Sequence, residues 1–171
     1  MLFALATHEH IWKSAFTGKM DAILREERYR LIHMDWSRFE TEDGDADHFT
    51  WKGFQTFAHY LSHSLHVAGM GDRTVRILSD STIDHCNWLD GERHGEADAY
   101  LVDCLSKKGI HSVIDSVCGS GFMAMRGEGM DFLTRARKMK KNETLLLVGG
   151  WNDQHTSYAV EDFDGGFAIT V

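Results

Sequence analysis

Proline is absent from this sequence of 171 residues, although average usage would give roughly eight. We find no physical reason for that absence in the sequence pattern. Cysteine is scarce as well: there are three, an odd number, and no two have the C-x-x-C spacing. A disulfide framework or a structural zinc site is therefore not expected, and a soluble, reducing compartment such as the cytoplasm fits best.

Basic residues are also few. Lys and Arg number 18 against 26 Asp and Glu, which gives a formal net charge of −8. Non-specific nucleic-acid binding needs clustered cations that neutralise phosphates, so the composition argues against that function class. The one basic run, 135–141, is interpreted as the exposed face of a helix.

Long hydrophobic runs are missing too. The apolar start of the chain, 1–6, is followed closely by His8, Glu9 and His10. It is too short for a signal peptide or a membrane span and is predicted to be a buried strand. A hydrophobic fraction of 43% and a charged fraction of 26% are ordinary for a globular protein. The length suits a single domain, residues 1–171, with one core.

Segments with the patterns of strands and helices alternate along the chain. Strands that alternate with helices of ten or more residues indicate right-handed crossovers and a parallel sheet covered on both faces, so the fold class is α/β. Such sheets place their sites at the carboxyl ends of the strands. The pattern predicts strands at 2–6, 30–35, 74–78, 110–117 and 144–148, and helices at 13–28, 95–107 and 129–140. A further helix is predicted to start after Thr50 as N-cap and to be closed by the glycines of 67–72.

Three of these strands are followed by polar or glycine-rich segments whose residues could take part in catalysis. Ser81 comes shortly after strand 74–78, and a serine nucleophile needs a base beside it. Gly121 follows strand 110–117, and without a Cβ its backbone N–H can approach a ligand closely. Asn152 follows strand 144–148, and its amide is a neutral donor suited to an oxyanion. Each signal alone is more often a turn or a helix cap.

A fourth segment, the acidic loop before the Thr50 helix, supplies a candidate base. Asp45 precedes His48 by three residues, so its carboxylate can turn back and accept the Nδ1–H of the imidazole. That contact fixes the tautomer and leaves Nε2 free to take a proton from a serine. Asp47 is worse placed because it is the immediate neighbour of His48. The four segments together predict one shared site.

The four segments resemble the conserved blocks of the SGNH hydrolases, the GDSL-type lipase and esterase family. The resemblance covers roughly residues 1–153. The blocks are Ser79-Asp80-Ser81 for G-D-S, Ser120-Gly121 for the glycine block, Gly150-Trp151-Asn152-Asp153 for G-x-N-D, and Asp45-Ala46-Asp47-His48 for D-x-x-H.

Two features depart from the family pattern. Ser79 stands where the family has the first glycine, which is tolerable if its backbone angles are ordinary. The Asp45–His48 block comes first in the chain rather than last. Cutting the usual chain before its D-x-x-H block and joining the old ends within 69–72 gives this order, and compact domains tolerate circular permutation. The permutation also predicts that Met1 and Val171 lie on the same side of the domain.

The resemblance implies a circularly permuted, flavodoxin-like three-layer α/β/α sandwich with a five-stranded parallel sheet. It also implies a serine esterase in which Ser81 is the nucleophile, His48 the base and Asp45 the residue that orients His48. The backbone N–H groups of Ser81 and Gly121 and the side chain of Asn152 would hold the oxyanion. The expected partner is a small-molecule ester, with no cofactor and no metal. The alternative is a flavodoxin-like domain that binds a ligand or partner and whose triad is no longer catalytic.

Overall fold

The computed structural model describes residues 2–6, 30–33, 36–43, 48–84, 94–122, 128–149 and 152. The predicted helix 13–28, the segment 157–171 and both chain ends lie outside these residues. The elements are β1 (Leu2–Ala6), β2 (Arg30–His33), the 3₁₀ helix η2 (Trp36–Arg38), α2 (Trp51–Val67), β3 (Thr74–Ser79), α3 (His94–Ser106), β4 (His111–Ser116), α4 (Phe132–Ala136) and β5 (Glu143–Val148).

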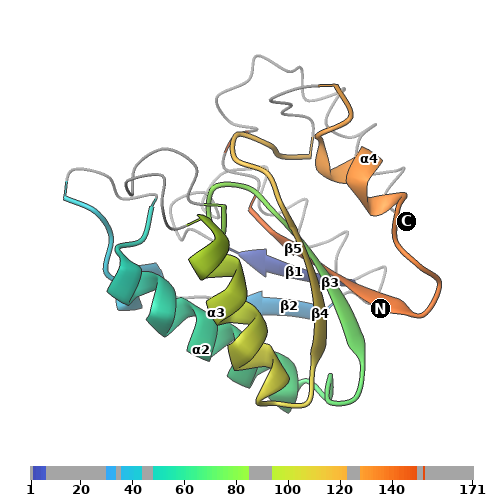
Figure 1. Cartoon of the computed structure of the whole chain (residues 1–171), viewed down its shortest axis with the longest axis horizontal. Helices are drawn as coiled ribbons and strands as arrows, with labels where there is room; N and C mark the ends of the chain where they lie inside the picture. The colour runs from blue at the N-terminus through green and yellow to red at the C-terminus, as the bar shows by residue number, and fades with distance from the viewer. Residues whose placement is uncertain are drawn as a thin grey trace.

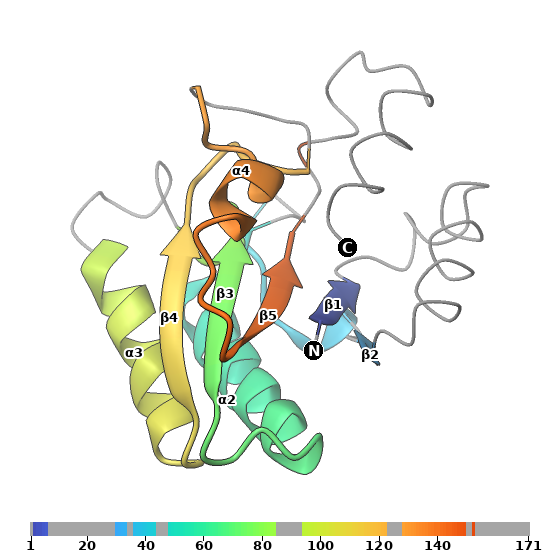
Figure 2. The ribbon, with the colours of Figure 1, turned by 90° about the vertical axis from the view of Figure 1, so that its right-hand side faces the viewer.

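The strands form a parallel sheet in the order β2-β1-β5-β3-β4. Ser79, the last residue of β3, is paired with Val148 of β5 on one side and with Ser116 of β4 on the other. The chain therefore leaves β3, β4 and β5 at the same edge of the sheet, as Figure 2 shows. The prediction of an α/β domain built on a parallel sheet is confirmed.

Helices cover both faces of this sheet. In Figures 1 and 2, α2 and α3 pack side by side on one face and α4 lies on the other. The strands alternate accordingly, because successive side chains of a strand point to opposite faces. Ile77 and Leu146 belong to the larger core cluster with α2 and α3. Their neighbours Leu78 and Leu147 pack instead with Phe132 of α4.

Helix α2 has the two ends that the sequence predicts. Thr50 is its N-cap, and the Thr50 hydroxyl accepts a hydrogen bond from the backbone N–H of Gly53 at 3.0 Å. At the other end Gly69 has a φ of 81°, the left-handed conformation that glycine adopts without strain. There Gly69 N donates to His66 O at 2.9 Å and Met70 N to Leu65 O at 3.0 Å, which is a Schellman motif.

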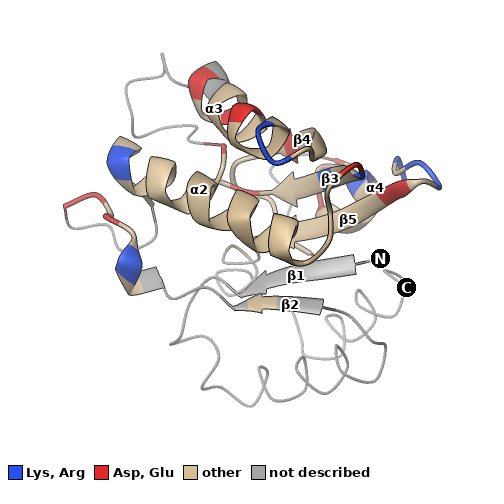
Figure 3. Cartoon of the chain, turned by 90° about the horizontal axis from the view of Figure 1, so that it is seen from below, with Lys and Arg blue, Asp and Glu red and all other residues tan. Residues whose placement is uncertain are grey.

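Helix α4 differs from its prediction. It runs only from Phe132 to Ala136 and not over 129–140. It starts later than predicted because Gly129 has a φ of 74° and Asp131 is the N-cap, which accepts a hydrogen bond from Thr134 N at 2.7 Å. The interpretation of the basic run as an exposed helix face is wrong at Arg135, which is only 2% exposed. The four basic residues after it are exposed beside α4 (Figure 3): Arg137, Lys138, Lys140 and Lys141.

No helix in the described part of the chain is both long enough and apolar enough to cross a membrane.

Candidate active site

Ser81 lies in a tight turn directly after β3. Asp80 builds this turn: its backbone oxygen accepts from Asp84 N at 3.0 Å. Its carboxylate oxygen Oδ1 accepts from both the backbone N–H and the hydroxyl of Thr82, at 3.0 and 2.7 Å. Asp80 is 1% exposed, whereas Ser81 is only half-buried. The buried carboxylate of Asp80 therefore holds the turn, and the turn keeps Ser81 partly exposed at the edge of the sheet.

The first position of the S-D-S block has ordinary backbone geometry. Among the non-glycine residues that the structure describes, only Asp72 has a positive φ, so Ser79 adopts no conformation that would favour glycine. Its side chain is fully buried, and its hydroxyl oxygen has no hydrogen-bond partner among the described residues. Serine is accordingly accommodated at this position without backbone strain.

His48 is held through its own carbonyl oxygen and through Phe49, the residue that follows it. The His48 carbonyl accepts from Glu42 N at 3.0 Å, and Phe49 forms an antiparallel bridge with Thr41. The Phe49 ring is 1% exposed and stacks on Phe57 of α2, with 5.3 Å between ring centroids. The histidine is therefore fixed between a backbone ladder and an aromatic residue anchored in the core.

These two segments bring His48 and Ser81 together. The imidazole Nε2 of His48 lies 3.0 Å from the hydroxyl oxygen of Ser81, across 33 residues of sequence. This is the distance at which a base can take the proton of a nucleophile. Their proximity is what the sequence predicts, and their catalytic roles stay predictions. Asp45, the predicted third member, and Asp47 lie outside the described residues.

The predicted oxyanion-hole residues lie at the same sheet edge. Among the described residues, no acceptor takes the backbone N–H of Ser81 or that of Gly121. The Asn152 side-chain Nδ2 donates to Ser120 O at 2.8 Å and has a longer contact of 3.4 Å with Asp80 Oδ2. Asn152 is thus bound to the turn after β4 and lies close to Asp80 in the turn after β3.

Asp80 is a site residue that sequence reasoning passed over. Its carboxylate packs against Gly149, directly after β5, so closely that a Cβ on Gly149 would collide with it. Gly149 also has a φ of 135°, which disfavours other residues. The sequence does hold a signal for Asp80: it is a charged residue between two serines at the end of a buried strand. A carboxylate that is buried there needs hydrogen-bond partners nearby.

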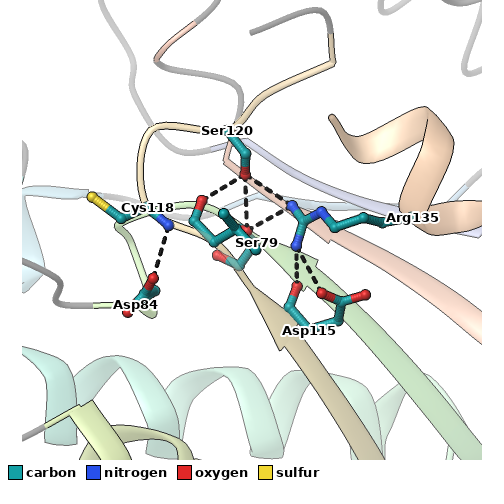
Figure 4. A network of polar contacts seen from close by, with 7 residues as sticks. Ser79, Asp84, Asp115, Cys118, Ser120 and Arg135 are labelled. Carbon is teal, nitrogen blue, oxygen red and sulfur yellow. Dashed lines mark hydrogen bonds and ion pairs between the residues drawn. The ribbon is translucent and has the colours of Figure 1, made fainter. Parts of the chain in front are cut away.

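Arg135 was also missed. Its guanidinium donates through Nη1 to the backbone oxygen and to Oδ1 of Asp115, at 2.6 and 3.0 Å. Through Nη2 it donates to Ser79 O at 3.0 Å and to Ser120 Oγ at 2.8 Å, as Figure 4 shows. The signal lay in spacing, since Arg135 falls three residues after Phe132 and four before Met139, on the apolar stripe of the helix pattern.

Cys118 is disulfide-bonded, although the sequence predicts no disulfide framework. Its backbone N–H donates to Asp84 Oδ2 at 2.8 Å, which connects the β4 turn to the Ser81 turn. Cys104 is a free and buried thiol, and burial raises its pKa. A raised pKa keeps Cys104 in the unreactive thiol form, so it is not a rival nucleophile.

In the described ranges, no group of three or more His, Cys, Asp or Glu side chains is arranged to hold a metal ion.

Comparisons with protein-family models, with curated proteins and with solved structures gave no match. The function is therefore inferred from the geometry of the site itself.

Proposed function

We propose that this protein is a serine ester hydrolase of the SGNH type, acting on a small-molecule ester without a cofactor. The observation that carries the proposal is the 3.0 Å contact between His48 Nε2 and Ser81 Oγ. Two backbone N–H groups in turns at the same sheet edge, those of Ser81 and Gly121, have no acceptor among the described residues. A base, a nucleophile and donors for an oxyanion are the parts that acyl transfer requires.

The reaction begins when Ser81 Oγ attacks the ester carbonyl carbon and His48 Nε2 takes the hydroxyl proton. The carbonyl oxygen becomes an oxyanion, and the N–H groups of Ser81 and Gly121 donate to it. The tetrahedral intermediate collapses, the alcohol leaves with the proton from His48, and the acyl group remains on Ser81. Water then attacks this acyl-enzyme with His48 again as base, which releases the acid and restores Ser81. Asp45 is proposed to orient His48.

Asn152 is proposed as the third oxyanion donor. Its side-chain amide carries two N–H bonds. One is used by Ser120 O at 2.8 Å, which fixes the orientation of the amide. The other has only the 3.4 Å contact with Asp80, beyond the range of a good hydrogen bond. This second N–H is the one that an oxyanion would take.

The strand order supports a circularly permuted, flavodoxin-like fold. When the count starts at the strand before the S-D-S block, β3, β4, β5, β1 and β2 become strands 1 to 5. The observed order β2-β1-β5-β3-β4, read from the other edge, then becomes 2-1-3-4-5, which is the flavodoxin-like order. In that order the direction of winding reverses between β3 and β5, and ligands bind at such a switch point. Ser81 follows β3 and Asn152 follows β5.

The test is turnover of p-nitrophenyl acetate together with labelling by a fluorophosphonate, in the wild type, Ser81→Ala and a control, Ser106→Ala. Ser106 is an exposed serine at the end of α3. We expect labelling on Ser81 by mass spectrometry, its loss in Ser81→Ala, and its retention in the control. A folded wild type that neither turns over the ester nor reacts with the probe would leave the alternative, a binding domain with an inactive triad. A panel of acyl chain lengths and acetylated sugars then defines the ester.

A further inference from the structure

Arg135 is the one buried cation among the residues whose burial is described, and it bonds to the turns that carry the proposed oxyanion donors. Arg135 is 2% exposed, and its four hydrogen bonds go to groups at the ends of β3 and β4. We propose that Arg135 is a positioning residue that holds the oxyanion donors in place. This inference rests on the proposed function, because it assigns a role within that site.

One link runs from Arg135 to the nucleophile turn. Arg135 Nη2 donates to Ser79 O at 3.0 Å, and Val117 N donates to the same oxygen at 2.9 Å. Ser79 is two residues before Ser81, so this carbonyl sets the direction in which the chain leaves β3. The guanidinium and the end of β4 therefore hold the peptide from which the turn starts.

A second link runs to the glycine turn. Arg135 Nη2 donates to Ser120 Oγ at 2.8 Å, and that hydroxyl donates to Val117 O at 2.6 Å. Ser120 immediately precedes Gly121, and its carbonyl oxygen holds the amide of Asn152. Nη2 of Arg135 thus bonds to both Ser79 and Ser120, as Figure 4 shows. Ser79 leads to Ser81, and Ser120 leads to Gly121 and accepts from Asn152.

Helix α4 fixes Gly121 from a second direction. Phe132 N, at the start of α4, donates to Gly121 O at 2.8 Å. The guanidinium carbon of Arg135 lies 5.2 Å from the centroid of the Phe132 ring, within cation–π range. Gly121 is therefore held by α4 through its own carbonyl oxygen and by Arg135 through the preceding residue, Ser120.

The geometry demands arginine rather than any cation. A guanidinium presents its donors in a rigid planar fork, whereas the lysine ammonium is a single point charge. Arg135 uses two separate nitrogens, one for Asp115 on β4 and the other for Ser79 and Ser120. A lysine at this position keeps the charge beside Asp115 but cannot serve both sets of acceptors.

The test compares Arg135→Lys with Arg137→Lys, a control at the exposed C-cap of the same helix. For p-nitrophenyl acetate we expect kcat to fall about 10- to 100-fold in Arg135→Lys, as misplacement of site groups causes. KM should change less than about threefold, because the donors act on the transition state rather than on bound ester. Fluorophosphonate labelling of Ser81 should slow in parallel. The control should match the wild type.

Two further variants separate positioning from folding. Arg135→Ala should recover part of its kcat when methylguanidinium is added, while Ser81→Ala should not. Ser120→Ala removes one acceptor of the guanidinium and keeps the cation. If the Arg135 variants do not fold, this variant still tests whether Arg135 positions the oxyanion donors. We expect its kcat to fall several-fold at nearly constant KM, and its effect to be non-additive with Arg135→Lys.

The inference is overturned if folded Arg135→Lys keeps kcat within about twofold, or if its loss merely follows the fraction of unfolded protein. An unchanged kcat in Ser120→Ala overturns it as well. In these cases the wild type and Arg137→Lys are active, so the proposed esterase stands. A wild type without turnover or labelling instead removes the proposed function and this role together.

Discussion

The backbone of Gly53, in the first turn of α2, lies directly against the carbonyl group of Glu40. A Cβ at Gly53 would overlap the Glu40 carbonyl oxygen and crowd its carbonyl carbon. Glu40 O also accepts from Thr50 N at 3.0 Å. Helix α2 and the segment that leads to His48 can therefore approach each other only because position 53 has no side chain.

Gly53→Ala should for this reason impair both stability and activity. Alanine is the better helix former by about 1 kcal/mol, but the overlap is with backbone, which cannot move aside as a side chain can. We expect a net loss of roughly 1–3 kcal/mol in the free energy of unfolding, as for other overpacked sites. We also expect a lower kcat, because displacement of Glu40 moves the loop that carries His48.

Thr56→Ala is the matched control for this change. Thr56 is exposed on the same helix, and among the described residues its hydroxyl bonds only to Lys52 O, one turn earlier. Surface changes of this kind stay within about 0.5 kcal/mol. Urea unfolding and esterase kinetics on both variants check the prediction, and a Gly53→Ala protein as stable as the control would refute it.

His48→Gln should remove most of the turnover without unfolding the protein. Glutamine retains polarity at a half-buried position but cannot accept and return the Ser81 proton. We expect kcat to fall on the order of 10³-fold or more, and the double variant with Ser81→Ala to be no worse than the poorer single variant, because triad members act as a unit. Steady-state kinetics on the three variants measure this. Effects that multiply independently would contradict a shared proton-transfer step.

Asn152→Ala should lower kcat by roughly 10²-fold, the usual cost of one oxyanion donor, with little change in KM. A smaller secondary loss is expected because Ser120 O loses its 2.8 Å partner. Asn152→Asp is the informative companion: it keeps the size of the side chain but replaces the donor with a carboxylate that repels an oxyanion. Kinetics should rank Asp below Ala, and the reverse ranking would place Asn152 outside the oxyanion hole.

The sequence was sufficient for the elements whose signals are local. The strand 144–148 and the cap at Thr50 are set by apolar runs and by capping chemistry, and the predicted bounds differ from the observed ones by a residue or two. The predicted start of α4 is too early because continued helical spacing over 129–140 conceals the role of Asp131 as N-cap. When a local N-cap competes with a longer periodic pattern in this way, the tertiary packing determines where the helix starts.

The candidate site was predictable where a residue acts through its own chemistry. Ser81 and His48 stand out because a nucleophile and a base have distinctive side chains at strand and helix ends. Arg135 and Asp80 act through partners far away in sequence: Arg135 bonds to Ser79, 56 residues before it, and Asp80 packs against Gly149. Such contacts arise from the order of strands in the sheet, which the pattern of one sequence does not specify.

Glu143, the first residue of β5, forms an ion pair with Arg76 of the neighbouring strand β3. Glu143 Oε2 accepts from Arg76 Nε at 2.7 Å and from Lys140 N at 2.9 Å, and the two side chains are only 4% and 12% exposed. The hydrogen bond from Arg76 lowers the pKa of Glu143, although burial opposes it. A carboxylate with a lowered pKa in the folded state stabilises that state above its unfolded pKa, and the contribution is lost as pH falls through the folded pKa.

Glu143→Gln should therefore destabilise the protein at pH 7, by about 1–3 kcal/mol for a hydrogen bond to a charged group. The difference from the wild type should shrink as the pH falls below about 4.3, the unfolded value, because the wild-type carboxyl group then becomes neutral as well. Asp103→Asn is the control, since Asp103 forms an exposed ion pair with Lys107, and such pairs contribute little. Urea unfolding at pH 7, 5 and 3 measures both. A Glu143→Gln deficit that stays constant over this range would show that the charge of Glu143 is not what stabilises the fold.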